Sequence, residues 1–349
     1  MPEKNFEYKK YSGKKTAMLI IGIAVCVLNF ILNIIIGSSS AVSASDLLYA
    51  IINLAGVSKL IYTIVWTIRI PTSIMSIIVG AALGLSGATM QTILNNPLAS
   101  PYTLGISAGA GVGASIAIMS GLGTLAVFGS FIVPICAFVF AFLACAGIYI
   151  ISRIKGFTSE IMVLTGIGMV FFFQALQSFL QYMASTEALQ AIVFWTFGSL
   201  TKADWTNIPI ITVVLVVVFI AIYSQSWKLT ALKLGDVKAK VLGINVERLR
   251  MVMFILISLL TATAVAFVGS IGFIGIVGPH IARIFIGEDQ RYYLPMSAIC
   301  GAVILSLASI ATKVVIPGSV FPIGILTALI GVPFFFALII RKSPANKCQ

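Results

Sequence analysis

Residues 224–250 read SQSWKLTALKLGDVKAKVLGINVERLR, a run rich in lysine and arginine inside a chain that is 60% hydrophobic and only 9% charged. Its basic residues heavily outnumber Asp236 and Glu247, so this segment must lie in water. Asp236 is expected to cap a short helix that Gly243 ends, and Asn245 is expected to start the next helix. We therefore predict about two turns of exposed helix, roughly 10 Å long. A rigid helix here suits force transmission to a soluble partner; a loop that only orients the chain in a membrane is the alternative.

The composition is that of an integral membrane protein. Apolar runs long enough to cross roughly 30 Å of hydrocarbon recur along the whole chain. We predict one transmembrane domain over residues 1–349, with a membrane bundle over residues 16–341 and a cytoplasmic loop over residues 224–250. The net charge of +12 is spread over loops without a nucleic-acid-binding motif, so lipid is the expected partner and nucleic acid is not. The five cysteines lack C-x-x-C spacing, and no metal site is expected.

The positions of lysine and arginine orient the chain. Five lysines precede the first apolar run, residues 16–37, which places the N-terminus in the cytoplasm. About ten spans follow from the apolar runs, with both termini inside. On this topology the basic residues outside are Lys59, Arg69, Lys202 and Lys313. AVSA at residues 41–44 imitates a signal-peptide cleavage site, but the run before it is longer than the usual 7–15 residues, so cleavage is the lesser alternative.

Glycine spacing predicts how several spans pack. Pro71 is expected to open the second span, on which Gly80 and Gly84 lie four residues apart and favour close helix packing. The next span has the same spacing at Gly105, Gly109 and Gly113. In VGSIGFIGIVGPH, residues 268–280, glycine recurs every third residue. A period of three leaves no single face of an α-helix, so we predict a broken helix there. Trp195 and Trp205 are expected to anchor an outer loop at the membrane interface.

The predicted span at residues 159–182 has one polar face. Near 100° per residue, the following residues fall on one side: Ser159, Gly166, Val170, Gln174, Gln177 and Gln181. An unpaired amide in hydrocarbon is costly, so these glutamines need water or a partner. We interpret the face as part of a wet translocation path; glutamines bonded to neighbouring helices are the alternative.

Residues and motifs that the sequence lacks disfavour several classes of function. No acidic residue lies in the middle of a predicted span, which disfavours an ion-coupled carrier. No G-x-x-x-x-G-K-[ST] phosphate loop is present, and one histidine is a poor basis for a membrane enzyme. Three hypotheses remain: a permease driven by a separate ATPase, an ion-coupled secondary carrier, and a membrane enzyme. The exposed basic helix favours the first, with no catalytic residue and no cofactor in this chain.

Six stretches of the chain resemble one family. They are RIP at residues 69–71, GAALGLSGATMQTILNNPLASPYTLGISAGAGVGA from Gly80, WTFGSL from Trp195, LGDVKAKVLG from Leu234, FVGSIGFIGIVGPHIAR from Phe267, and FPIGILTALIGVPFF from Phe321. The chain thus resembles the FecCD family of ABC-transporter permeases. This resemblance implies an all-α, type II importer permease with about ten helices, in a dimer with an identical or related chain in a bacterial plasma or inner membrane. It also implies cytoplasmic ATPase subunits and an extracellular or periplasmic binding protein. The cargo is expected to be a ferric siderophore, with haem or cobalamin as alternatives.

The resemblance also implies roles for particular residues. The helix that couples to the ATPase would comprise Leu234, Gly235, Asp236, Lys238, Lys240, Leu242 and Gly243. Thr158 and Ser159 would narrow the cytoplasmic gate, and Arg69 and Lys313, at an exposed outer rim, would receive acidic residues of the binding protein. The chain departs from the family pattern at Thr72, Gln290, Ser309 and Val320. These departures put in doubt how the binding protein docks on the outer face, but they do not affect the resemblance to the family.

Overall fold

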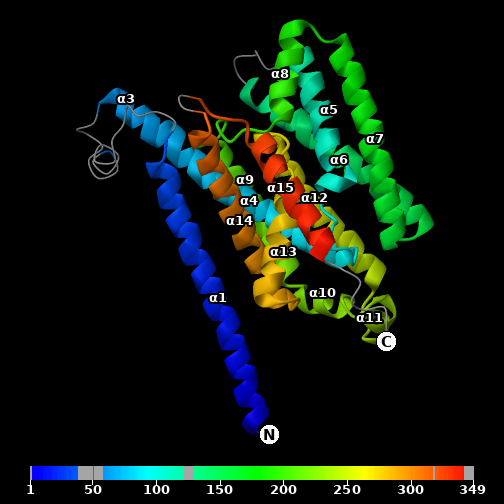
Figure 1. Cartoon of the computed structure of the whole chain (residues 1–349). Helices are drawn as coiled ribbons and strands as arrows, with labels where there is room; N and C mark the ends of the chain where they lie inside the picture. The colour runs from blue at the N-terminus through cyan, green and yellow to red at the C-terminus, as the bar shows by residue number, and fades with distance from the viewer. Residues whose placement is uncertain (1, 38–49, 51–57, 122–128, 317–318, 342–349) are drawn as a thin grey trace.

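The computed structural model describes the chain except residues 1, 38–49, 51–57, 122–128, 317–318 and 342–349, and the described residues form helices without strands (Figure 1). The elements in chain order are α1 (Pro2–Ile35), α3 (Lys59–Tyr62), the π-helix η1 (Thr63–Arg69), α4 (Ile70–Ile93), the 3-10 helix η2 (Tyr102–Leu104), α5 (Ile106–Met119), α6 (Gly129–Lys155), α7 (Ser159–Met183), α8 (Thr186–Thr196), α9 (Asn207–Tyr223), α10 (Ser226–Leu232), α11 (Asp236–Val241), α12 (Val246–Val268), α13 (Ile274–Ile286), α14 (Gln290–Val314) and α15 (Ile323–Arg341).

The helices form a membrane bundle. Within the described residues, six helices are long and apolar enough to cross a membrane, and the count rises to seven if α9 and α10, bent by 59°, make one span. Three shorter apolar helices lie in α5, α13 and α15. Each predicted span coincides with one of these apolar helices, but the number of crossings, about ten, stays a prediction. Figure 1 shows α10 and α11 at the same end of the bundle as the start of α1, with α3 and α8 at the other end.

Small residues let α4 and α14 touch along their backbones. A Cβ added to Gly80 would lie 2.5 Å from the carbonyl oxygen of Gly301, and one on Gly84 would clash with the backbone of Ser297. Gly109 and Gly113 of α5 meet the backbone of α6 in the same way. These contacts confirm the close packing that the four-residue spacing predicts.

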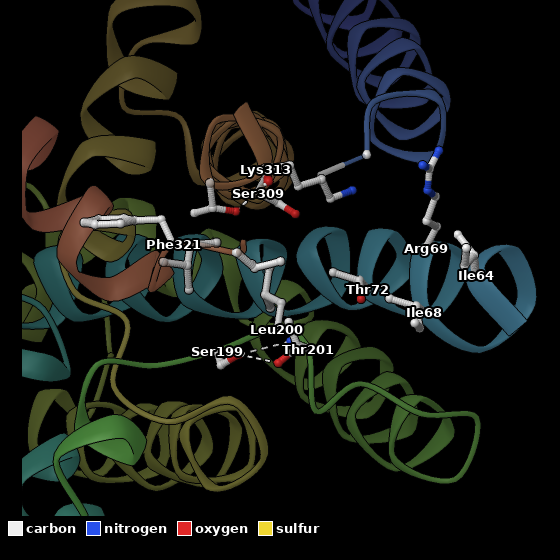
Figure 2. A pocket seen from close by; sticks show the side chains of 14 residues that line it. Ile64, Ile68, Arg69, Thr72, Ser199, Leu200, Thr201, Ser309, Lys313 and Phe321 are labelled. Carbon is white, nitrogen blue, oxygen red and sulfur yellow. Dashed lines mark hydrogen bonds between the residues drawn. The ribbon is translucent and has the colours of Figure 1, made fainter. Parts of the chain in front are cut away.

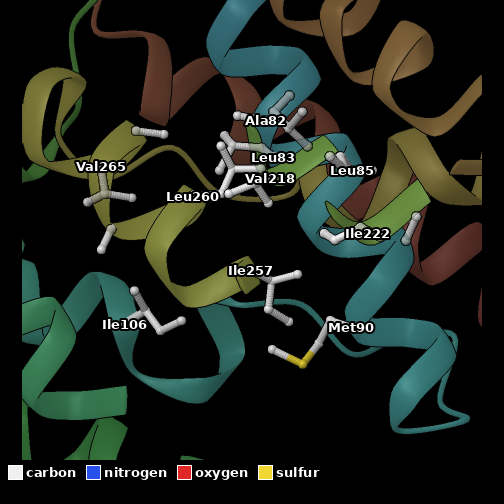
Figure 3. Close-up of a cluster of buried hydrophobic side chains, with 14 of the residues drawn as sticks. Ala82, Leu83, Leu85, Met90, Ile106, Val218, Ile222, Ile257, Leu260 and Val265 are labelled. Atoms are coloured by element: carbon white, nitrogen blue, oxygen red, sulfur yellow. The ribbon is translucent and has the colours of Figure 1, made fainter. Parts of the chain in front are cut away.

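The centre of the bundle is apolar. Leu85 of α4, Ile222 of α9 and both Ile257 and Leu260 of α12 are fully buried against one another's helices (Figure 3). By contrast, Val213, Val216 and Val217 on the other side of α9 are exposed. α9 and α12 therefore have one face in the core and one turned toward lipid.

The start of the second span differs from the prediction. The span begins at Lys59 and continues through α3 and η1 into α4, which ends at Ile93. Pro71 is the second residue of α4, but it does not open the span. Just before the proline the chain adopts the π-helix η1, and the N–H of Ile70 bonds the carbonyl of Val65 five residues back. A π turn is wider than an α turn, and this local change of register accommodates a ring that would otherwise clash with the preceding turn.

The outer loop before α9 contains a helix that the sequence analysis missed. α8 starts at the cap Ser185, whose hydroxyl accepts a hydrogen bond from the Ala188 N–H at 3.3 Å. Trp195 lies in its last turn and is buried, so its predicted role as an interfacial anchor is wrong. Trp205 is exposed and donates its ring N–H to the carbonyl of Trp66 at 2.9 Å.

The predicted break in the glycine-rich run is confirmed. α12 ends at Val268, and α13 begins at Ile274. Gly269 has φ +76° and Phe273 has φ +66°, both in the left-handed region that reverses a chain. For Phe273, which is not a glycine, this conformation costs about 1 kcal/mol or more. The Phe273 ring packs against Gly331 of α15, and a side chain at position 331 would clash with it.

Candidate functional site

The exposed helix that the sequence predicted is α11. It sits between Gly235, with φ +98°, and Gly243, with φ +79°. Ala239 is buried, whereas Val237 and Val241 are 77% and 83% exposed. The two valines are four residues apart on one face of α11, and the exposed Leu234 lies just before the helix. We call these three exposed apolar side chains the apolar stripe. Such a stripe is how an amphipathic helix fills a groove in a partner protein.

The C-terminal end of α11 is fixed by backbone hydrogen bonds. At its C-terminal end the N–H of Ile244 bonds the Ala239 carbonyl at 3.1 Å, and the N–H of Gly243 bonds the Lys240 carbonyl at 2.9 Å. This pair of bonds is a Schellman motif, which needs a left-handed residue and so favours glycine. Asn245 then caps α12 by accepting the Arg248 N–H at 3.0 Å. The predicted stop and restart are confirmed.

The predicted role of Asp236 as a helix cap is wrong. Gly235 occupies the cap position, and no side chain caps α11. Instead, the two oxygens of Asp236 accept hydrogen bonds from Arg250 Nη1 and Nη2, each at 2.8 Å. A two-pronged bond to a guanidinium is stronger and more directional than one bond to a backbone N–H, so the carboxylate faces the next helix.

Arg250 joins three parts of the chain, and the sequence analysis did not single it out. Its side chain is buried. Besides Asp236, it donates from Nε to the carbonyl of Ile93 at 2.8 Å and from Nη1 to the carbonyl of Phe157 at 3.1 Å. Ile93 is the last residue of α4, and Phe157 lies just before α7. The available sequence signal was an arginine one turn into an apolar helix, where a charge needs a partner.

The two predicted gate residues follow Phe157 directly. Thr158 is the cap of α7, and its hydroxyl accepts the Ile161 N–H at 3.3 Å. The side chain of Thr158 is exposed and that of Ser159 is half-buried. One arginine therefore connects α11 with the residue immediately before this pair.

The predicted polar face of α7 divides between packing and exposure. Gly166 is buried against Leu104, so it serves close packing. Gln177 is half-buried, and a Cβ added to Gly111 of α5 would lie 2.6 Å from its amide oxygen, so its side chain packs against α5. Gln174 is exposed and Gln181 is half-buried. Within the single chain, these residues do not yet enclose a channel.

Arg69 and Lys313 lie near each other at the outer end, but neither is exposed as predicted (Figure 2). They are 5% and 8% exposed. Arg69 Nη1 donates to the carbonyls of Ile34 and Ile35, each at 3.0 Å. Lys313 Nζ donates to Asn33, to Oδ1 at 2.6 Å and also to the carbonyl oxygen. Both cations thus hold the C-terminal end of α1, where carbonyl groups lack helical partners.

A small cavity of about 140 Å³ adjoins these two cations. It is also lined by Thr72, Ser309 and Phe321. The predicted exposure at the rim is therefore wrong, because the last turn of α1 takes up both side chains. Contact between them and a binding protein stays a prediction. Among the residues that the structure describes, no group of three His, Cys, Asp or Glu side chains could hold a metal ion.

Comparisons with known proteins agree with this architecture. An ABC transporter permease of Methanocaldococcus jannaschii, MJ0087, is 38% identical over 96% of this chain and 97% of its own length. An iron chelatin transport system permease of Helicobacter pylori is 37% identical over 80% of this chain and 82% of its own. The solved structure of a metal-chelate type ABC transporter in an inward-facing conformation superposes with a TM-score of 0.81 at 29% identity, covering 93% of this chain and 99% of that one.

The fold and these matches define a transmembrane permease subunit of an ABC importer. Such a subunit is a multi-pass membrane protein without an ATPase site of its own. Residues 23–341 match the FecCD transport family, and the chain belongs to that family.

Proposed function

We propose that this permease imports a ferric siderophore, driven by ATP that a separate cytoplasmic subunit hydrolyses. The observation that carries the coupling is the set of bonds around Arg250. They link the exposed helix α11, through Asp236, to the end of α4 and to the turn before α7. A movement imposed on α11 therefore reaches the cytoplasmic start of α7 through one side chain.

The stripe of Leu234, Val237 and Val241 is the proposed contact with the ATPase. Exposed apolar side chains on a short, rigid helix would gain hydrophobic burial in a groove of the partner. Lys238 and Lys240 flank the stripe and would favour an acidic rim around that groove. The helix can transmit force because Asp236 at its N-terminal end bonds Arg250 and the backbone bonds of Gly243 and Ile244 close its C-terminal end.

The proposed translocation path lies between two permease subunits. Of the six long apolar helices in the described residues, α7 buries the smallest share of its apolar window within its own chain. A second permease, identical or related, would cover part of that surface. Thr158 and Ser159 would then meet the same residues of the second subunit at the cytoplasmic end. Gln174 and Gln181 would lie along the path farther from the cytoplasm. Small hydroxyl side chains suit a gate because two copies can approach closely and separate again.

A ferric siderophore is the proposed cargo, delivered by an external binding protein. The relative from Helicobacter pylori is named for iron chelatin, and the solved neighbour for a metal chelate. Support also comes from the middle of the described spans, where no acidic residue lies. A free metal cation would find no carboxylate to bind there, whereas a neutral or anionic chelate would meet no repulsion from one.

Reconstitution of the full complex would test the proposal. We expect proteoliposomes containing the permease, its ATPase and its binding protein to accumulate ⁵⁵Fe-labelled siderophore only with ATP inside the compartment that holds the ATPase. Uptake should persist when a protonophore collapses the proton gradient. Uptake that follows the proton gradient and ignores ATP would show a secondary carrier. Accumulation of haem or cobalamin in place of the iron chelate would keep the importer and replace its cargo.

A further inference from the structure

An open groove of about 680 Å³ lies between α9, α10 and α12 at the end of the bundle that carries α11. Lys228 of α10 and Arg248 in the first turn of α12 line it at the membrane surface. Val252 and Leu256 line it farther along α12. Leu256 is eight residues beyond Arg248, which places it roughly 12 Å deeper into the bilayer. The groove therefore has a basic mouth and an apolar wall.

The two basic side chains at the mouth have no acidic partner. Within the part of the chain that the structure describes, the salt bridges engage Lys233, Arg250, Arg283 and Arg291, and neither Lys228 nor Arg248 takes part. Both are exposed. Glu247 is next to Arg248 in sequence, but it does not line the groove. The mouth thus presents positive charge to an anion.

The apolar wall is continuous with the surface that faces lipid. Ile220 of α9 and both Val252 and Ile255 of α12 are exposed apolar residues beside the groove. Trp227 precedes Lys228 and is 69% exposed, as is typical of an aromatic side chain at a membrane interface. A soluble partner can reach the mouth, but it cannot follow the groove to the depth of Leu256.

We propose that this groove binds an anionic phospholipid of the cytoplasmic leaflet. Its phosphate would pair with Lys228 and Arg248, and one acyl chain would run along Val252 and Leu256. Basic pockets between spans on the cytoplasmic side are suited to anionic headgroups, and the negative potential of that leaflet adds about a fivefold preference for each lysine or arginine near the surface. The contact between the acyl chain and the apolar wall then distinguishes a lipid from a free phosphate, which has no hydrocarbon chain.

The bound lipid would touch the end of α11. Gly243 and Ile244, which form the Schellman motif that ends α11, also line the groove. Anionic lipid would therefore contact the C-terminal end of α11, whereas the bonds to Arg250 hold Asp236 at its N-terminal end. This inference does not depend on the cargo or on the proposed gate, because it concerns only the membrane-embedded chain.

Native mass spectrometry of the purified full-length chain would test the lipid site. With phosphatidylglycerol and phosphatidylcholine of identical dioleoyl chains in competition, we expect phosphatidylglycerol to be retained preferentially. Lys228→Ala and Arg248→Ala should each lower that preference, because each removes one charged contact with the anionic headgroup, and the double variant should lower it more than either single change. Arg153→Ala with Lys155→Ala removes two exposed basic residues at the end of α6 and should leave the preference unchanged.

Two further measurements separate the parts of the site. Val252→Trp fills the apolar wall and should reduce retention of the diacyl lipid while the basic mouth remains, and glycerol phosphate should not displace the lipid. Thermal melting of each variant shows whether it is folded. Equal retention of the two lipids by the unaltered chain would overturn the proposal, as would an unchanged preference in the folded double variant. Displacement by glycerol phosphate would show a site for a free anion instead. Loss of ATPase binding in the double variant, with lipid preference intact, would assign the mouth to the protein partner.

Discussion

Arg250 and Asp236 lie fourteen positions apart in the chain, yet they form a two-pronged ion pair with both hydrogen bonds at 2.8 Å. The arginine is buried and the aspartate is partly exposed on α11. The same guanidinium also holds the carbonyls of Ile93 and Phe157. The N-terminal end of the exposed helix is consequently attached to the membrane bundle through one buried side chain.

Arg250→Ala should uncouple ATP hydrolysis from uptake. Hydrogen bonds to a charged group contribute about 1.5–3 kcal/mol each, and the variant loses those that connect α11 with the turn before α7. We expect uptake by the reconstituted complex to fall about tenfold or more while ATPase activity persists. Arg250→Lys should give an intermediate defect, because an ammonium group cannot reproduce the fork.

Lys155→Ala, at an exposed basic position on the same side, is the matched control for Arg250→Ala and should transport normally. If Arg250→Ala is folded and transports at the rate of the unaltered protein, the proposed connection is wrong. A parallel fall in uptake and ATPase activity would indicate lost assembly rather than lost coupling.

Gly243→Ala should impair coupling through backbone strain. At φ +79° an added Cβ costs roughly 1–2 kcal/mol, although no atom lies within 4 Å of it. Gly243→Pro should abolish uptake at equal expression, because proline cannot adopt this φ or donate the bond to Lys240. Gly13→Ala is the control, since Gly13 also has open space but lies in a regular helix. Normal uptake by Gly243→Pro would remove α11 from the mechanism.

Cysteines at position 159 should crosslink between two permease subunits. Ser159 opens α7, the long helix whose apolar window is least buried within its own chain, and the proposed gate brings two copies together. In a background without the native cysteines, we expect Ser159→Cys to form an intersubunit disulfide in at least one nucleotide state. Ile154→Cys, exposed on α6, is the control and should not crosslink. Failure of position 159 in every state would place the gate elsewhere.

Lys313→Met should loosen α1 whether or not a binding protein is present. Lys313 bonds Asn33 twice, and Asn33 Nδ2 also donates to Ser76 and Ser306, each at 3.2 Å. Loss of the charged bonds should lower the unfolding free energy by about 1–3 kcal/mol, measured as a lower melting temperature of the permease alone. A variant with unchanged melting but weaker binding of the external protein would instead support docking through this lysine.

Much of the architecture could be predicted from the sequence because it depends on local chemistry. Apolar runs predicted where the membrane helices lie, since hydrocarbon requires backbone groups to be satisfied within a helix. The spacing of Gly80 and Gly84 predicted close packing, and Gly243 and Asn245 predicted where α11 stops and α12 starts. In each case a few neighbouring residues carry the physical cause.

Tertiary structure decided which charged groups meet. Asp236 lies where it could have capped its own helix, but Arg250 provides a stronger partner from the following helix. Arg69 and Lys313 read as outer, exposed cations, but the unpaired carbonyls at the end of α1 and the side chain of Asn33 take them up. Sequence by itself determined the membrane helices, their breaks and the exposed basic segment, because periodicity and backbone conformation are local. Only the fold decided the partners of the buried cations, because those partners come from helices distant in sequence and hydrogen bonding to a buried charge depends on their approach.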